Sequence, residues 1–218
     1  MKIRQMQTKE KHILSPEGYP VLLYSFLLAL ALFLFCPYAG TLGFLWVLFC
    51  LYFFRNPKRQ QPEQKNVVLA PADGTIIRIE DVEEKNFLNK KMKMVSVFMS
   101  PFNVHVNRMP LTASIKDAKH IKGRFKAAFA DDAPEKNERF ATHLQTAEQK
   151  DIVMVQVAGW FARRIFNYLE SGDHCAQGKI FGVIKFGSRV DLYLPEDYTV
   201  TVDLKQKVKA GLTELGRK

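Results

Sequence analysis

An uncharged stretch of 37 residues, from Gly18 to Phe54, constrains the fold of this chain more than any other feature. It holds two apolar runs, Val21 to Phe35 and Thr41 to Phe54, with Cys-Pro-Tyr-Ala-Gly between them. A helix needs about 20 apolar residues to span a bilayer, and each run is somewhat shorter. Pro37 and Gly40 favour a break between the runs. The stretch therefore predicts an apolar helical hairpin that associates with a membrane.

A cleaved signal peptide and a buried core hairpin are the alternatives. A signal peptide fits poorly because a second apolar run follows at once, and an uncharged core hairpin of this length is unusual in a chain of 218 residues. Basic residues flank both ends, Lys9 and Lys11 before and Arg55, Lys58 and Arg59 after. Basic residues beside membrane segments are more common on the cytoplasmic side, so both ends of the hairpin are expected to face the cytoplasm. We expect the hairpin to span the cell membrane or dip into one leaflet, with the rest of the chain on the cytoplasmic side.

The sequence divides into four parts. Residues 1–17 form a basic N-terminal segment, residues 18–54 the membrane-associated hairpin, residues 55–65 a linker with two prolines, and residues 66–218 a globular domain. A chain of 218 residues is long enough to form one hydrophobic core of ordinary size.

Segments rich in β-branched residues follow one another through the globular part. They predict strands at Val67–Ala70, Thr75–Ile79, Lys93–Met99, Val104–Val106, Ala113–Ile121, Phe140–Thr146, Ile152–Val157, Lys179–Phe186, Val190–Leu194 and Thr199–Leu204. One short helix is expected around Phe161 to Leu169. Because strands and helices do not alternate, we expect a mainly β (α+β) fold, an antiparallel β sandwich or barrel-like domain preceded by the helical hairpin.

The net charge of +10, from 32 Lys and Arg against 22 Asp and Glu, indicates an anionic partner. Nucleic acid and an anionic membrane surface are the main candidates. The sequence has no aromatic–basic stacking pattern of the RNA-binding type, so we expect no nucleic acid partner. Its three cysteines lack metal-ligand spacing and suggest no disulfide framework, and we expect no metal.

One dipeptide near the C-terminus, Gly187-Ser188, is a candidate for self-cleavage. The Ser188 hydroxyl can attack the carbonyl of Gly187, and glycine tolerates the backbone geometry that this requires. Elimination across the Cα–Cβ bond of Ser188 and loss of ammonia would leave a covalent pyruvoyl group. Such a ketone can hold a substrate amine as a Schiff base and act as an electron sink. A bare Gly-Ser pair is more often a turn or bulge, so the dipeptide needs support from the rest of the chain.

Asp73, in a Pro-Ala-Asp-Gly turn, and His105 are candidates for acid–base chemistry. A histidine with a carboxylate behind it would supply Ser188 with both a base and an orienting group. An Asp in such a turn more commonly caps its own backbone. On strand alternation His105 shares a face with Asn103 and Asn107, and this polar face either is solvated or lines a site.

Several segments occur together in an order that is typical of one enzyme family. They are Phe54-Arg55-Asn56-Pro57, Ala70-Pro71-Ala72-Asp73-Gly74, Ser96 to His105, Asn137-Glu138-Arg139, Val155-Gln156-Val157-Ala158-Gly159, Ala162-Arg163-Arg164-Ile165, Gly182, and Lys185 to Asp191. On these segments, which cover most of the chain from Phe54 to Pro195, it resembles the short bacterial and archaeal phosphatidylserine decarboxylases. Each segment alone is weak, and together they are highly specific.

The resemblance implies autocatalytic serinolysis between Gly187 and Ser188. The products would be a large chain 1–187 and a small chain 188–218, which the pyruvoyl group heads. Asp73 matches an Asp linked to self-processing. His105 matches the first histidine of a His-x-x-His pair in longer relatives, and Arg108 stands at the second position, so roles of the second histidine do not carry over.

The implied reaction is pyruvoyl-dependent decarboxylation of phosphatidylserine, held as a Schiff base, to phosphatidylethanolamine in the membrane. The implied cofactor is pyruvate, covalently derived from Ser188, and His105 would reprotonate the substrate. Ser188, His105 and Asp73 are thus the catalytic candidates. Arg189 and Asn103 are candidates for substrate binding. Arg189 either steers an anionic group or forms a solvated salt bridge.

Two alternatives stay open. In the first, the chain is a non-enzymatic membrane-tethered β-domain and Gly187-Ser188 is a turn. In the second, it is a related decarboxylase that acts on a different amino-acid headgroup. The sequence also leaves the oligomeric state open, a homo-oligomer included.

Overall fold

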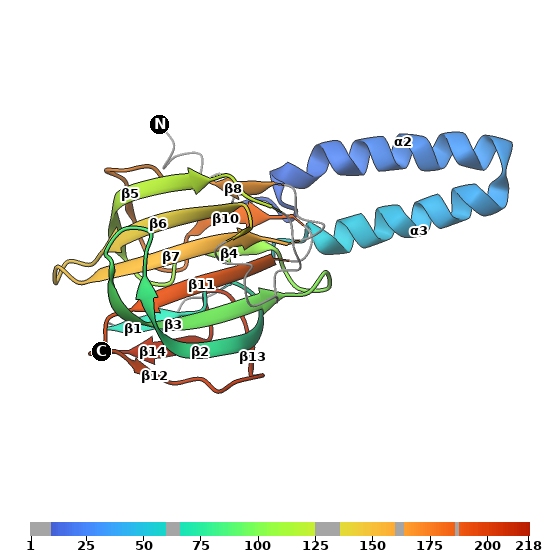
Figure 1. Ribbon diagram of the computed structural model, residues 1–218. Coiled ribbons are helices and arrows are strands. Elements are labelled where there is room, and N and C mark those ends of the chain that lie inside the picture. The colour runs from blue at the N-terminus through green and yellow to red at the C-terminus, as the bar shows by residue number, and fades with distance from the viewer. Residues whose placement is uncertain (1–9, 60–65, 125–135, 160–163, 186–187) are drawn as a thin grey trace.

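The computed structural model describes residues 10–59, 66–124, 136–159, 164–185 and 188–218. These residues form a curled β domain, from one end of which two helices project side by side (Figure 1).

The two helices form the predicted hairpin. A short 3-10 helix, η1 (Pro16–Gly18), leads into α2 (Tyr19–Phe35), and α3 (Pro37–Phe53) returns toward the domain. The helices pack closely because Gly40 lies against the backbone of Phe33, where a Cβ would come within 2.3 Å of the Phe33 Cα. The helical stretch Pro16–Phe35 is long and apolar enough to cross a membrane, whereas α3 is shorter.

The described strands are short to medium in length. They are β1 (Val67–Leu69), β2 (Gly74–Glu84), β3 (Lys90–Met99), β4 (Val106–Arg108), β5 (Ala113–Ile121), β6 (Arg139–Gln145), β7 (Asp151–Ala158), β8 (Ile165–Asn167), β9 (His174–Cys175), β10 (Ile180–Ile184), β11 (Ser188–Leu194), β12 (Thr199–Val200), β13 (Lys207–Val208) and β14 (Glu214–Arg217).

The strands form one large sheet and two small ones. The large sheet has the order β13-β2-β3-β11-β7-β6-β5-β9, and the small sheets have the orders β1-β14-β12 and β4-β10-β8. Among the strands described, every pairing is antiparallel. The mainly β, antiparallel fold with an N-terminal pair of apolar helices is therefore confirmed.

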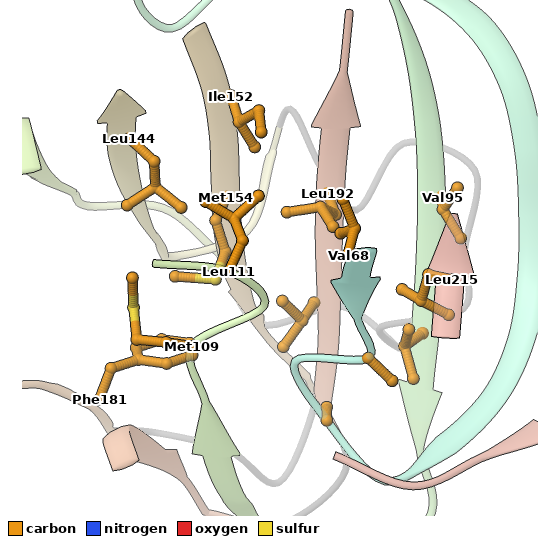
Figure 2. Packing of buried hydrophobic residues seen from close by; sticks show 14 of the residues in the cluster. Val68, Val95, Met109, Leu111, Leu144, Ile152, Met154, Phe181, Leu192 and Leu215 are labelled. Atoms are coloured by element: carbon orange, nitrogen blue, oxygen red, sulfur yellow. The ribbon is translucent and has the colours of Figure 1, made fainter. Parts of the chain in front are cut away.

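The main core lies between the large sheet and the small ones. Val95, Met154 and Leu192 of the large sheet belong to the same buried cluster as Val68 and Leu215 of the β1-β14-β12 sheet (Figure 2). A second buried cluster, which includes Met94, Val153, Val155 and Tyr193, covers the other face of the large sheet. Strands near the centre of this sheet are therefore buried on both faces, which explains their continuous apolar character.

The predicted helix around Phe161 to Leu169 is wrong over its middle part. Residues Ile165–Asn167 form strand β8, because they pair with Gly182–Ile184 of β10. Phe161 lies outside the described residues. The predicted strand at Val104–Val106 is also displaced, since β4 begins at Val106.

Candidate active site

The candidate site is organised around the end of β3 at Met99. Ser188, the first residue of β11, pairs with Met99 on one side of β3. On the other side of β3 runs β2, which begins directly after Asp73. The chain that leaves β3 reaches His105 six residues later, and the His105 carbonyl accepts a hydrogen bond from the Ile184 N–H (3.3 Å). The fold thus brings Ser188, Asp73 and His105 to the same end of the sheet.

Ser188 is fully buried between Met99 of β3 and Ala158 of β7. Strand alternation directs its side chain to the main-core face that Val190 also faces. The Ser188 Oγ has no hydrogen-bond partner among the described residues. Burying a hydroxyl without a hydrogen-bond partner costs about 1–3 kcal/mol of folding free energy. The Ser188 Oγ is therefore available to act as a nucleophile or to form a hydrogen bond with a substrate. Gly187, the other half of the predicted cleavage site, lies outside the described residues.

His105 is buried and has a defined tautomer. Its Nδ1 lies 2.9 Å from the carbonyl oxygen of Asn103. Because a carbonyl only accepts hydrogen bonds, Nδ1 carries the proton and Nε2 presents a lone pair. Within the described ranges Nε2 is buried and lacks a hydrogen-bond partner.

The protonation of His105 is set mainly by its burial. The pKa of His105 is lowered to about 4, mainly by burial and in smaller part by the charge of Arg55. The Asn103 carbonyl and the charge of Asp73 oppose this shift. At neutral pH the imidazole is therefore uncharged, and Nε2 can act as a base.

A carboxylate was expected to hydrogen-bond to His105 and orient it. The Asn103 carbonyl occupies this place instead, because it accepts the hydrogen bond from His105 Nδ1. The Asp73 carboxylate instead accepts hydrogen bonds from both terminal nitrogens of Arg59, at 2.7 and 2.8 Å, and from the Ala210 N–H at 2.8 Å. These partners also replace the local Asx turn that the Pro-Ala-Asp-Gly sequence favours. Asp73 acts on His105 through its charge.

The polar face predicted around His105 is buried rather than solvated. The Asn103 Oδ1 accepts hydrogen bonds from the N–H and the hydroxyl of Ser100, both at 2.8 Å. Asn107 is fully buried, and its Oδ1 accepts a hydrogen bond from the Gln156 Nε2 at 2.7 Å. Asn103 therefore holds the turn that leads to His105, and its side chain is engaged within that turn.

Arg189 lies on the opposite face of the sheet from Ser188, as strand alternation requires. It is fully buried, and its guanidinium pairs with Asp191 at 2.7 and 2.9 Å. The expected solvated salt bridge is thus a buried one. This geometry does not support a role in substrate binding, because the charge of Arg189 is engaged away from Ser188.

Two side chains at the site were missed by sequence reasoning, which assigned them to the hairpin and the linker. The ring of Phe53, the last residue of α3, stacks on the imidazole of His105 with centroids 3.9 Å apart. Arg59 holds Asp73, as described above. No local pattern marks these two contacts, because aromatic and basic residues at the end of an apolar helix are also typical of a membrane interface.

The side chains at this end of the sheet supply a buried hydroxyl, a neutral imidazole and a paired carboxylate. In the parts of the chain that the structure describes, no three His, Cys, Asp or Glu side chains gather as metal ligands. The arrangement suits nucleophilic attack by Ser188 with transfer of its proton to a nearby base.

Burial of His105 is expected to make the protein less stable in acid. The unfolded histidine titrates near 6.5 and the folded one near 4. Between these values the unfolded state binds more protons, so the free energy of unfolding falls as the pH drops from 6.5 to 4, by about 3 kcal/mol. Denaturant unfolding of Ser188→Ala and of the double variant Ser188→Ala, His105→Gln, both uncleaved, at several pH values in this window, measures the effect. Equal pH dependence in both proteins would contradict it.

Known proteins resemble this chain over most of its length. The sequence model of the phosphatidylserine decarboxylase family matches residues 46–215. A phosphatidylserine decarboxylase proenzyme of Geobacter metallireducens is 41% identical over 209 residues, which cover 93% of this chain and 95% of the relative. The proenzyme of Syntrophus aciditrophicus is 37% identical over 210 residues, 95% and 99% of the two chains. That of Cytophaga hutchinsonii is 41% identical over 208 residues, 90% and 94% of the two chains. With these matches and this fold, the chain belongs to the phosphatidylserine decarboxylase family.

Proposed function

We propose that this protein decarboxylates phosphatidylserine to phosphatidylethanolamine by means of a pyruvoyl group made from its own Ser188. One observation carries the proposal. Ser188 Oγ and His105 Nε2 are both buried, both lack a partner among the described residues, and both belong to the same end of the sheet. A nucleophile and a base left unsatisfied together are what self-cleavage needs.

In the first stage the chain cleaves itself. The Ser188 hydroxyl attacks the carbonyl of Gly187 while the His105 Nε2 takes its proton, and an ester replaces the peptide bond. Elimination at Ser188 then breaks the ester and releases the carboxyl end of chain 1–187. The dehydroalanine that remains takes up one water and loses one ammonia, which leaves a pyruvoyl group on chain 188–218. One water is consumed and one ammonia is released in total.

In the second stage the pyruvoyl group supplies an electron sink for loss of the substrate carboxylate. The buried position of Ser188 fits such a group, because it keeps water away from a reactive ketone. His105 Nε2 takes up a proton from the substrate ammonium group and then delivers it to the substrate carbon, while the Asn103 carbonyl fixes the other ring nitrogen.

The two chains are expected to stay together after cleavage. In the small chain 188–218, β11 lies inside the large sheet and pairs with both β3 and β7 of the large chain. The later strand β14 pairs with β1. Separating the chains would open these ladders and expose the main core.

The helix pair is proposed to hold the domain at the cytoplasmic face of the cell membrane. Its large side chains, such as Leu34, Phe35 and Leu48, are exposed. A lipid substrate remains in its bilayer, so an anchored enzyme meets it within the membrane. The net positive charge of the chain would add attraction to anionic lipids.

The activity is tested with purified protein in mixed vesicles of phosphatidylserine and phosphatidylcholine. Release of carbon dioxide together with formation of phosphatidylethanolamine is expected, and vesicles of phosphatidylcholine alone are the blank. Free serine and other amino-acid headgroups, offered in parallel, test the related decarboxylase. If fully cleaved protein released carbon dioxide from one of these and not from phosphatidylserine, the proposed substrate would be wrong.

Asp73→Asn is expected to impair self-cleavage. The change removes the charge that pairs with Arg59, whose side chain is 6% exposed, and breaking a buried pair from one side costs about 3–5 kcal/mol. A matched control is Asp81→Asn, because Asp81 lies on the same strand β2 and is exposed. The uncleaved fraction over time, read on denaturing gels, measures the effect. Equal cleavage in both variants would remove Asp73 from the mechanism.

A further inference from the structure

The segment that leaves helix α3, Phe53–Arg59 (the exit segment), touches both acid–base candidates. Sequence reasoning treats most of it as a linker, yet several of its side chains are buried against the β domain. Phe53 is fully buried, Asn56 is 6% exposed, and the Arg59 side chain is also 6% exposed. A flexible connection would leave such side chains in solvent.

Phe53 covers one face of His105. The two rings stack with centroids 3.9 Å apart and planes inclined by 27°. Phe53 also packs on Phe54, at 5.0 Å between centroids, in a small cluster that closes the base of the helix pair. The Asn103 carbonyl holds the Nδ1 of His105, and the ring of Phe53 holds the plane of the imidazole. Among the described residues, the Nε2 of His105 has no hydrogen-bond partner, so this nitrogen is available to act as the base.

Basic side chains fasten the same segment to the domain. The Arg55 Nη2 donates to the carbonyl of Phe102, in the loop that carries His105, at 2.9 Å. Arg59 donates to both carboxylate oxygens of Asp73 and, at 2.7 Å, to the Ala210 carbonyl. From the domain side, the buried Arg108 donates to the Asn56 Oδ1 and the Pro57 carbonyl, both at 3.2 Å.

The charges that act on His105 come from two elements. Arg55, in the exit segment, disfavours the imidazolium, and Asp73, in the turn before β2, favours it. Asp73 is neutralised in turn by Arg59. The exit segment therefore sets the surroundings of His105 in three ways. Phe53 covers the imidazole ring, Arg55 contributes a positive charge, and Arg59 pairs with the negative charge of Asp73.

We propose that the exit segment is a positioning element of the active site, in which Phe53 orients His105 and Arg59 orients Asp73. Correct docking of the helix pair on the domain is then a condition for self-cleavage, in addition to any role in membrane attachment. The reaction itself rests on the proposed function, whereas the contact between Phe53 and His105 can be tested without it.

The first test is a titration of His105 by NMR in the full-length Ser188→Ala chain in detergent micelles. The comparison is between Phe53 and Phe53→Leu. The smaller, non-aromatic side chain admits water to the imidazole, so the pKa of His105 should rise by at least about one unit toward its ordinary value. Phe44→Leu is the control, because Phe44 packs on Phe26 and Phe33 within the helix pair. It should leave the pKa of His105 unchanged.

The second test is the pH profile of self-cleavage with Ser188 intact. In Phe53→Leu the acidic limb should move upward with the pKa of His105, so that a rise of one unit makes cleavage at pH 5, relative to pH 7.5, about twofold slower than in the wild type. Phe44→Leu should keep the wild-type profile.

A third test addresses the ion pair between Arg59 and Asp73. Arg59→Gln should slow cleavage, whereas Lys58→Gln, which removes a positive charge from an exposed neighbouring residue, should not.

The results separate this proposal from the proposed function. If the wild type does not cleave, the proposed function fails, but the NMR titration still reports whether Phe53 controls His105. If the wild type cleaves and Phe53→Leu leaves the pKa of His105 unchanged, Phe53 is only a packing residue and the proposal is overturned. A uniform loss of rate at every pH, without movement of the acidic limb, would overturn it as well.

Discussion

Ser188→Ala is expected to remain one uncleaved chain with no decarboxylase activity. The hydroxyl is the only atom of this side chain that can attack the Gly187 carbonyl, and the ester that it forms is the group whose elimination leads to the pyruvoyl end. Removal of one oxygen from a fully buried site where it has no partner among the described residues should leave the fold intact or slightly more stable. Denaturing gels and a phosphatidylserine assay measure the two losses.

Ser96→Ala provides a matched control for this variant. Ser96 lies on β3, opposite Asp191 of β11, is also fully buried, and its hydroxyl also lacks a partner within the described ranges. It faces the other side of the large sheet from Ser188. This variant should cleave and turn over like the wild type. Normal turnover in Ser188→Ala would rule out the mechanism, whatever the control does.

His105→Gln is expected to have the second largest effect. Glutamine can keep a hydrogen bond to the Asn103 carbonyl but offers no basic nitrogen, so both proton transfers lose their carrier. Self-cleavage should slow by about 10²- to 10⁴-fold, the usual contribution of general acid–base catalysis. The half-time of cleavage after synthesis, followed on gels at pH 7.5, measures the loss.

His143→Gln is the control for this change. His143 lies on β6, where its Nε2 is 2.9 Å from Asp151, and it is not part of the candidate site. Its cleavage should match the wild type. If His105→Gln cleaved at the wild-type rate, another group would take the Ser188 proton, and the assignment of His105 as the base would be wrong.

Much of the fold follows from local sequence pattern. The uncharged stretch with a proline near its middle predicted the helix pair, and runs of β-branched residues predicted most long strands, with Ala113–Ile121 found at the predicted bounds. The segment around Ile165 shows where local pattern fails. Its strand exists because β10 lies beside it, and that pairing joins residues 15 to 19 positions apart, as in Gly182 with Asn167 and Ile184 with Ile165, which a local pattern does not register.

The candidate site was predictable in its members and less so in its contacts. Ser188, His105 and Asp73 were named from chemistry and family resemblance, and the register of β3 with its neighbours brings them to one end of the sheet. Their partners depend on tertiary structure. Nothing local in the sequence indicates that Asp73 pairs with Arg59 or that Phe53 stacks on His105. Such contacts arise only when the base of the helix pair packs on the domain.

The measurement that tests the central claim most directly is intact mass spectrometry of the purified protein. Self-cleavage predicts two chains, 1–187 and 188–218, whose masses sum to that of the uncleaved chain plus one water minus one ammonia. The smaller chain should be lighter by one ammonia than a fragment that begins with serine. That difference distinguishes a pyruvoyl end from ordinary proteolysis at the same bond. A single unbroken chain in an active preparation, or a small chain with a serine end, would contradict the account.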